Sequence, residues 1–172
     1  TELAIEIAKT INVGIHNIDS RQLYKGMDIG TAKPTLQQQK LIKHYLLDIK
    51  EPNEPITLHE FKKEADCSLN TTIKEKNIGF LVGGSGLYIK ALTSGLCPPA
   101  VPPQIKFREE LKKIGQFECY QLLEKCDPPA WKRIGKRDST RTIRALEVFY
   151  STGKRMSSLQ SYKAPCWNLI EL

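Results

Sequence analysis

The chain has 172 residues, of which 40% are hydrophobic and 26% are charged, a composition typical of a globular protein with one core and a small second module. No apolar run is long enough to cross a bilayer, and the first ten residues lack the basic-then-apolar order of a secretory signal. We therefore expect a soluble, cytoplasmic protein, and we expect it to act as a monomer.

The cysteines and histidines are scattered along the chain, and no two cysteines form a C-x-x-C pair. This spacing argues against a disulfide framework and against a zinc site. The residues concerned are Cys67, Cys97, Cys119, Cys126, Cys166, His16, His44 and His59.

The net charge of +7 is unevenly distributed. Residues 1–97 carry 12 Lys and Arg against 11 Asp and Glu, whereas residues 98–172 carry 14 against 8. A one-sided basic excess is typical of a protein that binds a polyanion. A solvated basic surface explains the same charge equally well, so both interpretations stay open at this point.

The first third of the chain alternates between helical and extended patterns. Residues 1–10 have apolar side chains at helical spacing, and residues 13–18 read as a short strand that ends at Asp19. Residues 22–34 contain two glycines and end in proline, which predicts a loop. Thr35 is suited to cap a helix that continues through Lys43.

The same alternation continues to residue 92. Residues 45–49 read as a second strand, and Thr57-Leu-His-Glu60 is a capping box that opens a helix. The continuously apolar stretch 77–82 predicts a buried strand, followed by the loop Gly83-Gly-Ser-Gly86 and a helix over 87–92. Alternating helices and strands of this kind predict an α/β fold with a parallel sheet.

The pattern changes after the α/β part. Residues 97–103 are rich in proline and read as a linker, and residues 107–150 show only helical spacing. Asp138 is suited to cap the last of these helices, and Gly153 to end it.

These patterns suggest three parts. We assign residues 1–97 to a partial α/β core and residues 98–160 to a small helical domain. Residues 161–172 are expected to begin a strand that returns to the core, from Cys166 to Leu172.

Two segments that follow strands carry chemically useful groups. Because parallel strands end at the same edge of a sheet, Asp19-Ser-Arg-Gln22 and Gly83-Gly-Ser-Gly86 are expected to share one rim, where such folds bind ligands. Backbone N–H groups at a helix start could hold an anion there. Each feature also has a structural interpretation, since a glycine-rich loop can be a simple turn and Asp19 can be a helix cap.

The densest basic segment lies between Lys132 and Arg144. Arg141 and Arg144 are three residues apart on one predicted helix face, and guanidinium groups suit phosphate oxygens and unpaired bases. The alternative is an ion pair between Arg144 and Glu147 on a solvated face. The cations of the segment are Lys132, Arg133, Lys136, Arg137, Arg141 and Arg144.

Four segments, in this order along the chain, resemble those of the tRNA dimethylallyltransferase (IPP transferase) family. The resemblance implies a P-loop NTPase-like, nucleotide-binding (ATP-binding) α/β core with an inserted helical domain that grips the tRNA anticodon stem-loop. It also implies transfer of a dimethylallyl group from dimethylallyl diphosphate, with Mg²⁺, to N6 of the adenosine 3′ of the anticodon, after that base is flipped out. The segments are DSRQLYKGMDIGTAKP (19–34), HYLLDI (44–49), LVGGSGLYIKAL (81–92) and RTIRALEVFYSTGK (141–154).

The resemblance also assigns residues. Asp19 matches the general base that takes the amine proton, and Ser85 matches a residue that contacts the reacting nucleotide. Thr1 matches the hydroxyl residue that contacts the diphosphate and the metal. The matched tRNA-binding positions are Asp19, Ser20, Arg21, Gln22, Ser85, Arg108, Thr140, Arg141, Thr142, Ile143 and Arg144.

The sequence departs from the family pattern at its start. The family opens with a G-x-x-x-x-G-K-[ST] phosphate-binding loop, whereas this sequence begins at Thr1, the residue that follows the lysine of that loop. Tyr45 also stands where many members have a second histidine. We therefore expect a fragment without the N-terminal P-loop and the C-terminal part, which transfers no prenyl group alone.

Three other functions compete with this interpretation. One is a non-catalytic RNA-binding remnant, and another is an adenylate isopentenyltransferase that acts on free nucleotides. The basic segment argues against the adenylate isopentenyltransferase, because a mononucleotide needs no extended phosphate-binding surface. The third, a small-molecule kinase, does not explain the four segments.

Overall fold

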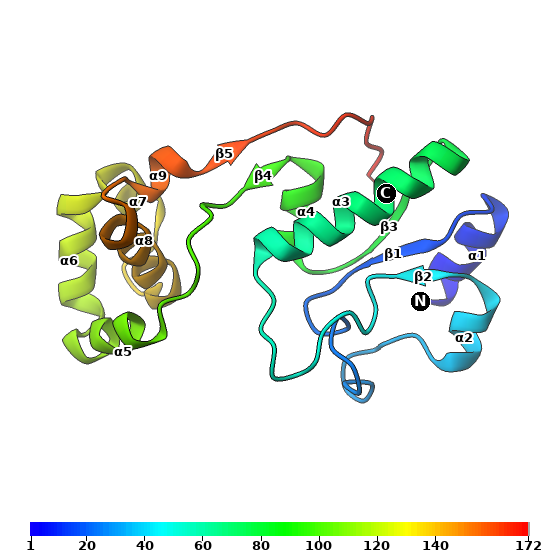
Figure 1. Cartoon of the computed structure of the whole chain (residues 1–172), viewed down its shortest axis with the longest axis horizontal. Coiled ribbons are helices and arrows are strands. Elements are labelled where there is room, and N and C mark those ends of the chain that lie inside the picture. The colour runs from blue at the N-terminus through cyan, green and yellow to red at the C-terminus, as the bar shows by residue number, and fades with distance from the viewer. Residues whose placement is uncertain (172) are drawn as a thin grey trace. The chain divides into compact units, whose positions relative to one another are not determined.

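The structure, a computed structural model, describes residues 1–171 of the chain, and Leu172 lies outside the described residues. The chain forms two compact units, which we call the sheet unit (residues 1–96 and 163–171) and the helical unit (residues 97–162). The helices, labelled in Figure 1, are α1 (Glu2–Thr10), α2 (Leu36–Leu41), α3 (Leu58–Lys76), α4 (Gly86–Thr93), α5 (Ile105–Ile114), α6 (Gln116–Cys126), α7 (Pro128–Arg133), α8 (Ser139–Thr152) and α9 (Met156–Leu159). The strands are β1 (Ile15–Ile18), β2 (His44–Tyr45), β3 (Phe80–Gly83), β4 (Leu96–Cys97) and β5 (Ser161–Tyr162).

The sheet unit is built on a parallel sheet in which β1 lies between β2 and β3. Ile15 pairs with His44 on one side of β1, and Ile18 pairs with Gly83 on the other. The predicted α/β class with a parallel sheet is therefore confirmed. Since the strands run in the same direction, the segments after β1 and β3 leave the sheet at one rim.

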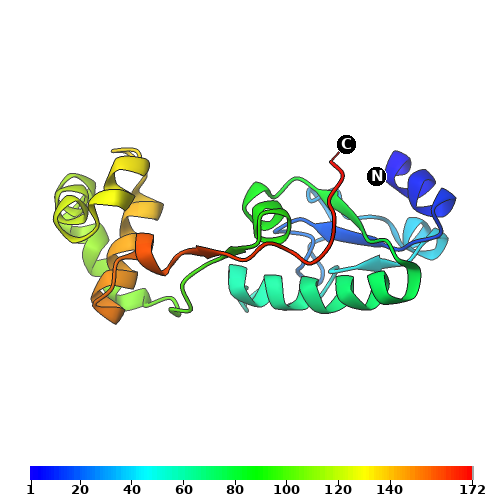
Figure 2. The same cartoon turned by 90° about the horizontal axis from the view of Figure 1, so that it is seen from above.

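Helices cover both faces of this sheet. Residues alternate between faces along a strand, so Ile15 packs with Ile5 and Ala8 of α1, whereas Ile18 packs with α3 and α4 on the other side. Figure 2 shows α3 along one side of the strands and α1 on the other. The three layers bury the middle strand completely, since all four side chains of β1 are buried.

The predicted cap at Thr35 and the predicted capping box at Thr57 are both confirmed, and Thr35 forms a capping box as well. The Thr35 hydroxyl accepts from the Gln38 backbone, and the Thr57 hydroxyl accepts from the Glu60 backbone at 3.2 Å. The helix after Thr35 is shorter than predicted and ends at Leu41. It stops there because Ile42 is already extended and leads directly into β2.

The predicted strand over 45–49 is wrong beyond Tyr45. Leu46 and Asp48 have φ values of +63° and +52°, a left-handed conformation that no strand can hold. Leu46 still reaches the core, at 6% exposure, so its apolar side chain is buried in a tightly bent segment. Apolar residues alone did not distinguish this bend from a strand.

The other two strands begin later than predicted because the preceding residues belong to helix ends. The backbone N–H of Val13 donates to Ala8, so the chain pairs in the sheet only from Ile15. Asn77 adopts a left-handed conformation that ends α3, and β3 starts at Phe80.

Gly83 allows the close approach of β1 and β3 at the rim. A Cβ atom at this position would lie 2.1 Å from the Ile18 carbonyl oxygen and 2.8 Å from its Cα atom. Backbone atoms in a paired strand cannot move aside easily, so only glycine fits here. At Gly84, in contrast, an added Cβ meets nothing within 4 Å.

The helical unit is confirmed as helical over the predicted stretch. Helix α8 is its centre and packs against α5 and α6. Asp138 caps α8 by accepting from the Arg141 backbone, and Gly153 ends it with φ +67°, as predicted. The buried core consists of Leu111, Cys119, Leu123, Ala130, Ile134, Ile143, Ala145 and Leu146.

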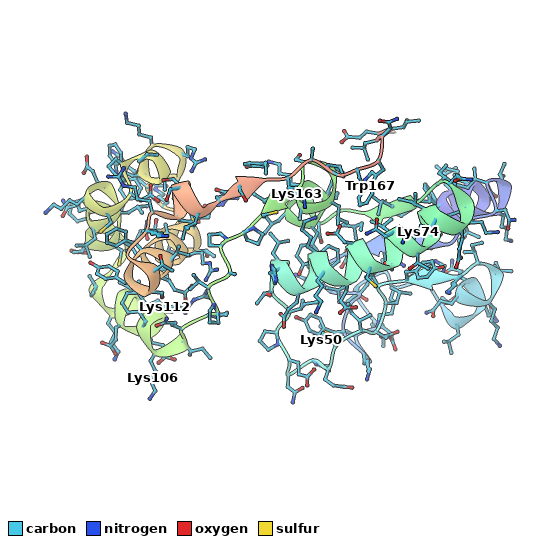
Figure 3. All side chains as sticks on the ribbon, turned by 45° about the horizontal axis from the view of Figure 1, so that its top comes forward. Lys50, Lys74, Lys106, Lys112, Lys163 and Trp167 are labelled. Atoms are coloured by element: carbon cyan, nitrogen blue, oxygen red, sulfur yellow. The ribbon has the colours of Figure 1, made fainter. Side chains whose placement is uncertain are left out.

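The expected return strand is wrong for residues 166–171, which form no strand. The chain instead forms β5, which pairs with β4. Trp167, labelled in Figure 3, packs against the core of the sheet unit without sheet pairing. The Trp167 side chain therefore stabilises the sheet unit by burying apolar surface rather than by strand pairing.

Glu147 joins α5, α8 and the linker inside the helical unit. Its side chain is fully buried and receives two hydrogen bonds from the Arg108 guanidinium, at 2.6 and 2.7 Å, and one from the Gln104 backbone at 2.7 Å. Arg144 donates to the same carboxylate and to the carbonyl oxygen of Val101. Burial alone would raise the pKa of Glu147, but these hydrogen bonds lower it to about 2.

We expect Gly83→Ala to destabilise the complete protein, because the new methyl group overlaps the Ile18 backbone. The loss should be at least about 2 kcal/mol, as for other overpacked sites. Gly84→Ala is the matched control and should change the free energy of unfolding by less than about 1 kcal/mol. Urea denaturation followed by circular dichroism measures both, and equal losses would contradict the proposed close approach.

Glu147 should make the stability of the helical unit depend on acid pH. A carboxylate with a lowered pKa stabilises the fold above its unfolded pKa, and this contribution is lost as the pH falls from about 4.5 to about 2. For a shift of this size the total is roughly 3 kcal/mol. Thermal unfolding across this pH range should show the loss.

Glu147→Gln should be destabilised at neutral pH by roughly 3 kcal/mol, because two arginines lose their buried partner. Glu110→Gln, which removes an exposed acid paired with Lys113, should lose less than about 0.5 kcal/mol. If both variants behaved alike, the buried arrangement would not carry the stability assigned to it.

Candidate active site at the strand ends

A pocket of about 240 Å³ opens at the rim of the sheet unit, where β1 and β3 end. Every wall residue belongs to the sheet unit. They include Thr1, Asn17, Asp19, Gln22, Gly83 and Gly84. The structure thus brings together the two rim segments that the sequence pattern singled out.

Asp19 holds a fixed carboxylate at this pocket. Its Oδ1 atom accepts from the backbone N–H groups of Arg21, at 2.8 Å, and Gln22, at 3.2 Å. Its Oδ2 atom has no hydrogen-bond partner among the described residues. One oxygen therefore stabilises a turn, whereas the helix-cap role considered as the alternative for this residue is wrong, since no helix begins here. The other oxygen is left to accept a proton from a ligand.

Ser85 lies directly beside this turn. Its Oγ atom accepts from the Ser20 backbone at 2.9 Å, and its own backbone N–H donates to the Ile18 carbonyl at 3.2 Å. Although it occupies the N-cap position of α4, its side chain makes no capping hydrogen bond. The hydroxyl proton is free of the helix and could be donated to a ligand.

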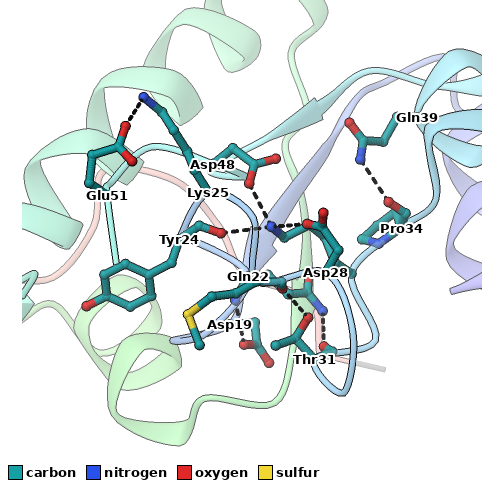
Figure 4. A network of polar contacts seen from close by, with 12 residues as sticks. Asp19, Gln22, Tyr24, Lys25, Asp28, Thr31, Pro34, Gln39, Asp48 and Glu51 are labelled. Atoms are coloured by element: carbon teal, nitrogen blue, oxygen red, sulfur yellow. Dashed lines mark hydrogen bonds and ion pairs between the residues drawn. The ribbon is translucent and has the colours of Figure 1, made fainter. Parts of the chain in front are cut away.

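Gln22 connects the pocket to the loop that follows β1. Its side-chain amide nitrogen donates to the carbonyl oxygen of Thr31 at 3.0 Å (Figure 4). The same nitrogen also donates to the carbonyl oxygen of Ala32, at 3.2 Å. These two bonds keep the loop folded back against the rim. Ser20 and Arg21, between Asp19 and Gln22, are exposed.

Thr1 lies at another wall of the pocket. It is exposed and occupies the N-cap position of α1, but its side chain makes no capping hydrogen bond. Its hydroxyl is therefore not used by the helix. This places an available hydroxyl and the Asp19 carboxylate around one pocket.

The sequence interpretation missed other polar wall residues, among them Asn17 and His44. Asn17 lies on β1, two residues before Asp19, and its amide donates to the Tyr45 carbonyl at 2.9 Å. His44 opens β2, and its Nδ1 atom lies 2.9 Å from the Ile42 carbonyl. Burial lowers the pKa of His44 and outweighs the hydrogen bond to Ile42, which raises it.

The predicted basic segment is part of the helical unit. Lys132, Lys136 and Arg137 are exposed and form no ion pair among the residues that the structure describes. Arg141 is exposed too and pairs with Asp138 at 2.9 Å. Lys106 and Lys112 of α5, labelled in Figure 3, add two exposed cations.

The other predicted contact residues of the helical unit are less accessible. The side chains of Thr142 and Ile143 are buried, whereas Thr140 is exposed. Arg108 and Arg144 are partly buried against Glu147, so the ion pair considered as the alternative for Arg144 is present. Contact of any of these residues with RNA stays a prediction.

The part of the chain that the structure describes contains neither a metal-binding cluster nor a membrane-spanning helix. No group of three or more His, Cys, Asp or Glu side chains is arranged to hold a metal ion within residues 1–171. Over the same range, none of the helices has the length and apolarity needed to span a membrane.

The sequence is similar to a known family of proteins and to individual members of it. The family model described as IPP transferase matches residues 22–171. A tRNA dimethylallyltransferase from a strain of Prochlorococcus marinus is 69% identical over all 172 residues of this chain. One from a strain of Synechococcus is 54% identical over the same length. The chain spans a little over half of these relatives, 58% and 56% of their lengths.

Solved structures show the same similarity. A tRNA delta(2)-isopentenylpyrophosphate transferase from Staphylococcus epidermidis is 34% identical, with a TM-score of 0.52 over 91% of this chain and 52% of that one. A eukaryotic dimethylallyltransferase acting on tRNA is 28% identical, with a TM-score of 0.74 over 91% of this chain and 40% of that one. Because the family model covers most of the chain and the relatives match it throughout, the chain belongs to the IPP transferase family.

Proposed function

We propose that the complete protein transfers a dimethylallyl group from dimethylallyl diphosphate to N6 of the adenosine 3′ of the anticodon in tRNA. The relatives named tRNA dimethylallyltransferase support this reaction. The observation that carries it is the Asp19 carboxylate at the pocket, with one oxygen fixed by two backbone N–H groups and the other available.

The proposed step joins N6 of adenine to C1 of the donor and breaks the bond between C1 and the diphosphate oxygen. The electron pair of that bond leaves with the diphosphate, and the proton of N6 passes to Oδ2 of Asp19. Because an adenine amine is a weak nucleophile, a carboxylate in hydrogen-bond reach of its proton assists as the new bond forms. Ser85 and Gln22 are proposed to orient the base beside Asp19.

The leaving diphosphate needs cations and hydrogen-bond donors. Mg²⁺ commonly binds such a group with one or two protein oxygens and the phosphates themselves, and the Thr1 hydroxyl at the pocket suits that role. When bound, the ion would neutralise charge that builds up on the diphosphate. We assign Thr1 to diphosphate and metal binding on this basis.

The helical unit is proposed to bind the anticodon stem-loop. Its exposed cations suit phosphate oxygens, and we assign this contact first to Lys136, Arg137 and Arg141. Arg108 and Arg144 already neutralise Glu147, so we propose that they shape this surface and reach RNA only with their remaining N–H groups.

We also propose a cytoplasmic location, where tRNA modification takes place. Four cysteines, Cys67, Cys119, Cys126 and Cys166, are unpaired thiols, the state that a reducing compartment maintains.

A non-catalytic RNA-binding role is the second candidate, because the exposed cations would bind RNA whether or not the pocket is active. Transfer of labelled dimethylallyl groups to an anticodon stem-loop separates the two functions. Binding that weakens with salt, without transfer by the complete protein, would favour the second. Transfer to free AMP rather than RNA would favour an adenylate prenyltransferase.

Asp19→Asn should lower kcat for prenyl transfer by about 100-fold or more, because the amide cannot take the proton. Asparagine keeps an oxygen that can accept from Arg21 and Gln22, so the turn and the thermal midpoint should be preserved. Mass spectrometry of the RNA product measures the rate. Retention of at least half of kcat would contradict the assignment of Asp19 as the base.

The double variant Lys136→Gln, Arg137→Gln should weaken RNA binding about tenfold at 0.1 M salt and reduce the salt dependence of log K by about 1 per residue. The control is Lys74→Gln, Lys76→Gln, which removes two exposed cations of α3 in the sheet unit. Gel-shift titration at several salt concentrations measures both. Equal weakening in the two variants would mean that net charge, rather than this surface, binds the RNA.

A further inference from the structure

Lys33 is a buried cation in the loop beside the pocket. Its side chain is 3% exposed, and its ammonium group donates to the Tyr24 carbonyl at 2.8 Å, to Asp28 at 2.7 Å and to Asp48 at 2.6 Å (Figure 4). The three acceptors use all three of its protons. Burial alone would lower the pKa of Lys33, but the hydrogen bonds to both carboxylates raise it, so the group stays charged.

This ammonium ties together two stretches of chain. Tyr24 and Asp28 belong to the loop between β1 and α2, whereas Asp48 belongs to the bent segment after β2. The backbone N–H of Asp48 also donates to the Gln22 carbonyl, at 3.3 Å. Asp48 therefore contacts both ends of the loop, Gln22 at its beginning and Lys33 at its end.

The anchored backbone is in an unfavourable conformation. Ala32 and Asp48 have φ values of +53° and +52°, in the left-handed region. Such residues cost of order 1–3 kcal/mol each and persist only where surrounding contacts hold them. The ammonium holds Asp48 directly, and by fixing Lys33 it also restrains the adjacent Ala32, whose carbonyl is bonded to Gln22.

The loop held in this way forms part of the pocket wall. Thr31, Ala32 and Pro34 line the pocket, and the carbonyls of Thr31 and Ala32 accept from the side chain of Gln22. The backbone N–H of Gln22 in turn donates to Oδ1 of Asp19. A continuous set of hydrogen bonds therefore runs from the Lys33 end of the loop to the carboxylate.

We propose that Lys33 is a positioning residue, which holds the 22–34 loop against the rim so that Gln22 and Asp19 keep the orientation needed for prenyl transfer. This inference rests on the proposed function. Lys33 contacts neither the pocket nor a reacting atom, because it is absent from the pocket wall and all its donors are used.

The carboxylates around Lys33 explain why its loss should act on the loop rather than on the whole fold. The side chains of Asp28 and Asp48 are 66% and 40% exposed, so water can solvate both when the ammonium is removed. No buried charge is left without a partner, which is the usual cause of large destabilisation. The expected effect is therefore local loss of order.

The test uses the complete protein with the substitution Lys33→Met, which keeps an unbranched apolar chain and removes the charge. We expect kcat on an anticodon stem-loop to fall at least tenfold, while KM for dimethylallyl diphosphate changes less than threefold. Amide hydrogen exchange of Asp48 should accelerate at least tenfold, and that of the buried α3 residue Leu69 should be unchanged. Lys33→Arg keeps the charge and should recover most of the lost kcat.

The matched control is Lys25→Met, which removes an exposed cation of the same loop that pairs only with Glu51 among the described residues. In this variant, kcat and the rate of amide hydrogen exchange at Asp48 should stay within twofold of the values for the protein without substitutions. Unchanged kcat and exchange in Lys33→Met would overturn the inference. Equal acceleration at Leu69 would also overturn it, because the residue would then stabilise the whole unit. Absence of prenyl transfer by the unchanged protein would instead overturn the proposed function.

Discussion

The parallel pairing of β1 with β3 is the constraint on which the arrangement of the pocket depends. Ile18 and Gly83 end the two strands as paired residues, so the segments that follow leave the sheet side by side. The Ile18 carbonyl accepts from the backbone N–H of Ser85. The Ser85 hydroxyl in turn accepts from the backbone N–H of Ser20, in the loop that follows β1. A carboxylate and a hydroxyl 66 positions apart in sequence become neighbours because two strands share one direction and one register.

The fold class and the rim were predictable because they follow from local patterns. A continuous apolar run predicts a buried strand, and a glycine-rich loop after it predicts a turn, so Asp19 and Ser85 could be assigned to one edge. Asn17 and His44 were missed, because their role depends on which face of a strand meets α1. The bend at Asp48 was read as a strand for a related reason. Its conformation is held by Lys33, a contact across 15 residues that no local pattern records.

The helical unit shows why charge in a sequence does not translate directly into a binding surface. Arg137 and Arg144 are equivalent in the sequence, since both are arginines of one basic segment. In the structure, Arg144 donates to a buried carboxylate and to two carbonyl oxygens. Glu147 was recognisable as a partner at i,i+3 spacing. The bidentate contribution of Arg108, from a helix 39 residues away, was not. Only the folded chain divides the cations into those that build the unit and those left for a ligand.

The burial of Glu147 affects how the protein responds to electrolyte. Mobile ions weaken attractions between exposed charges over a distance of about 10 Å at 0.1 M, but they enter a buried pair far less. The cations on the surface are open to that weakening, whereas the carboxylate between Arg108 and Arg144 has no exposed surface. If this unit binds a polyanion as proposed, raising the ionic strength should release the polyanion well before it destabilises the unit, so the two processes can be observed separately.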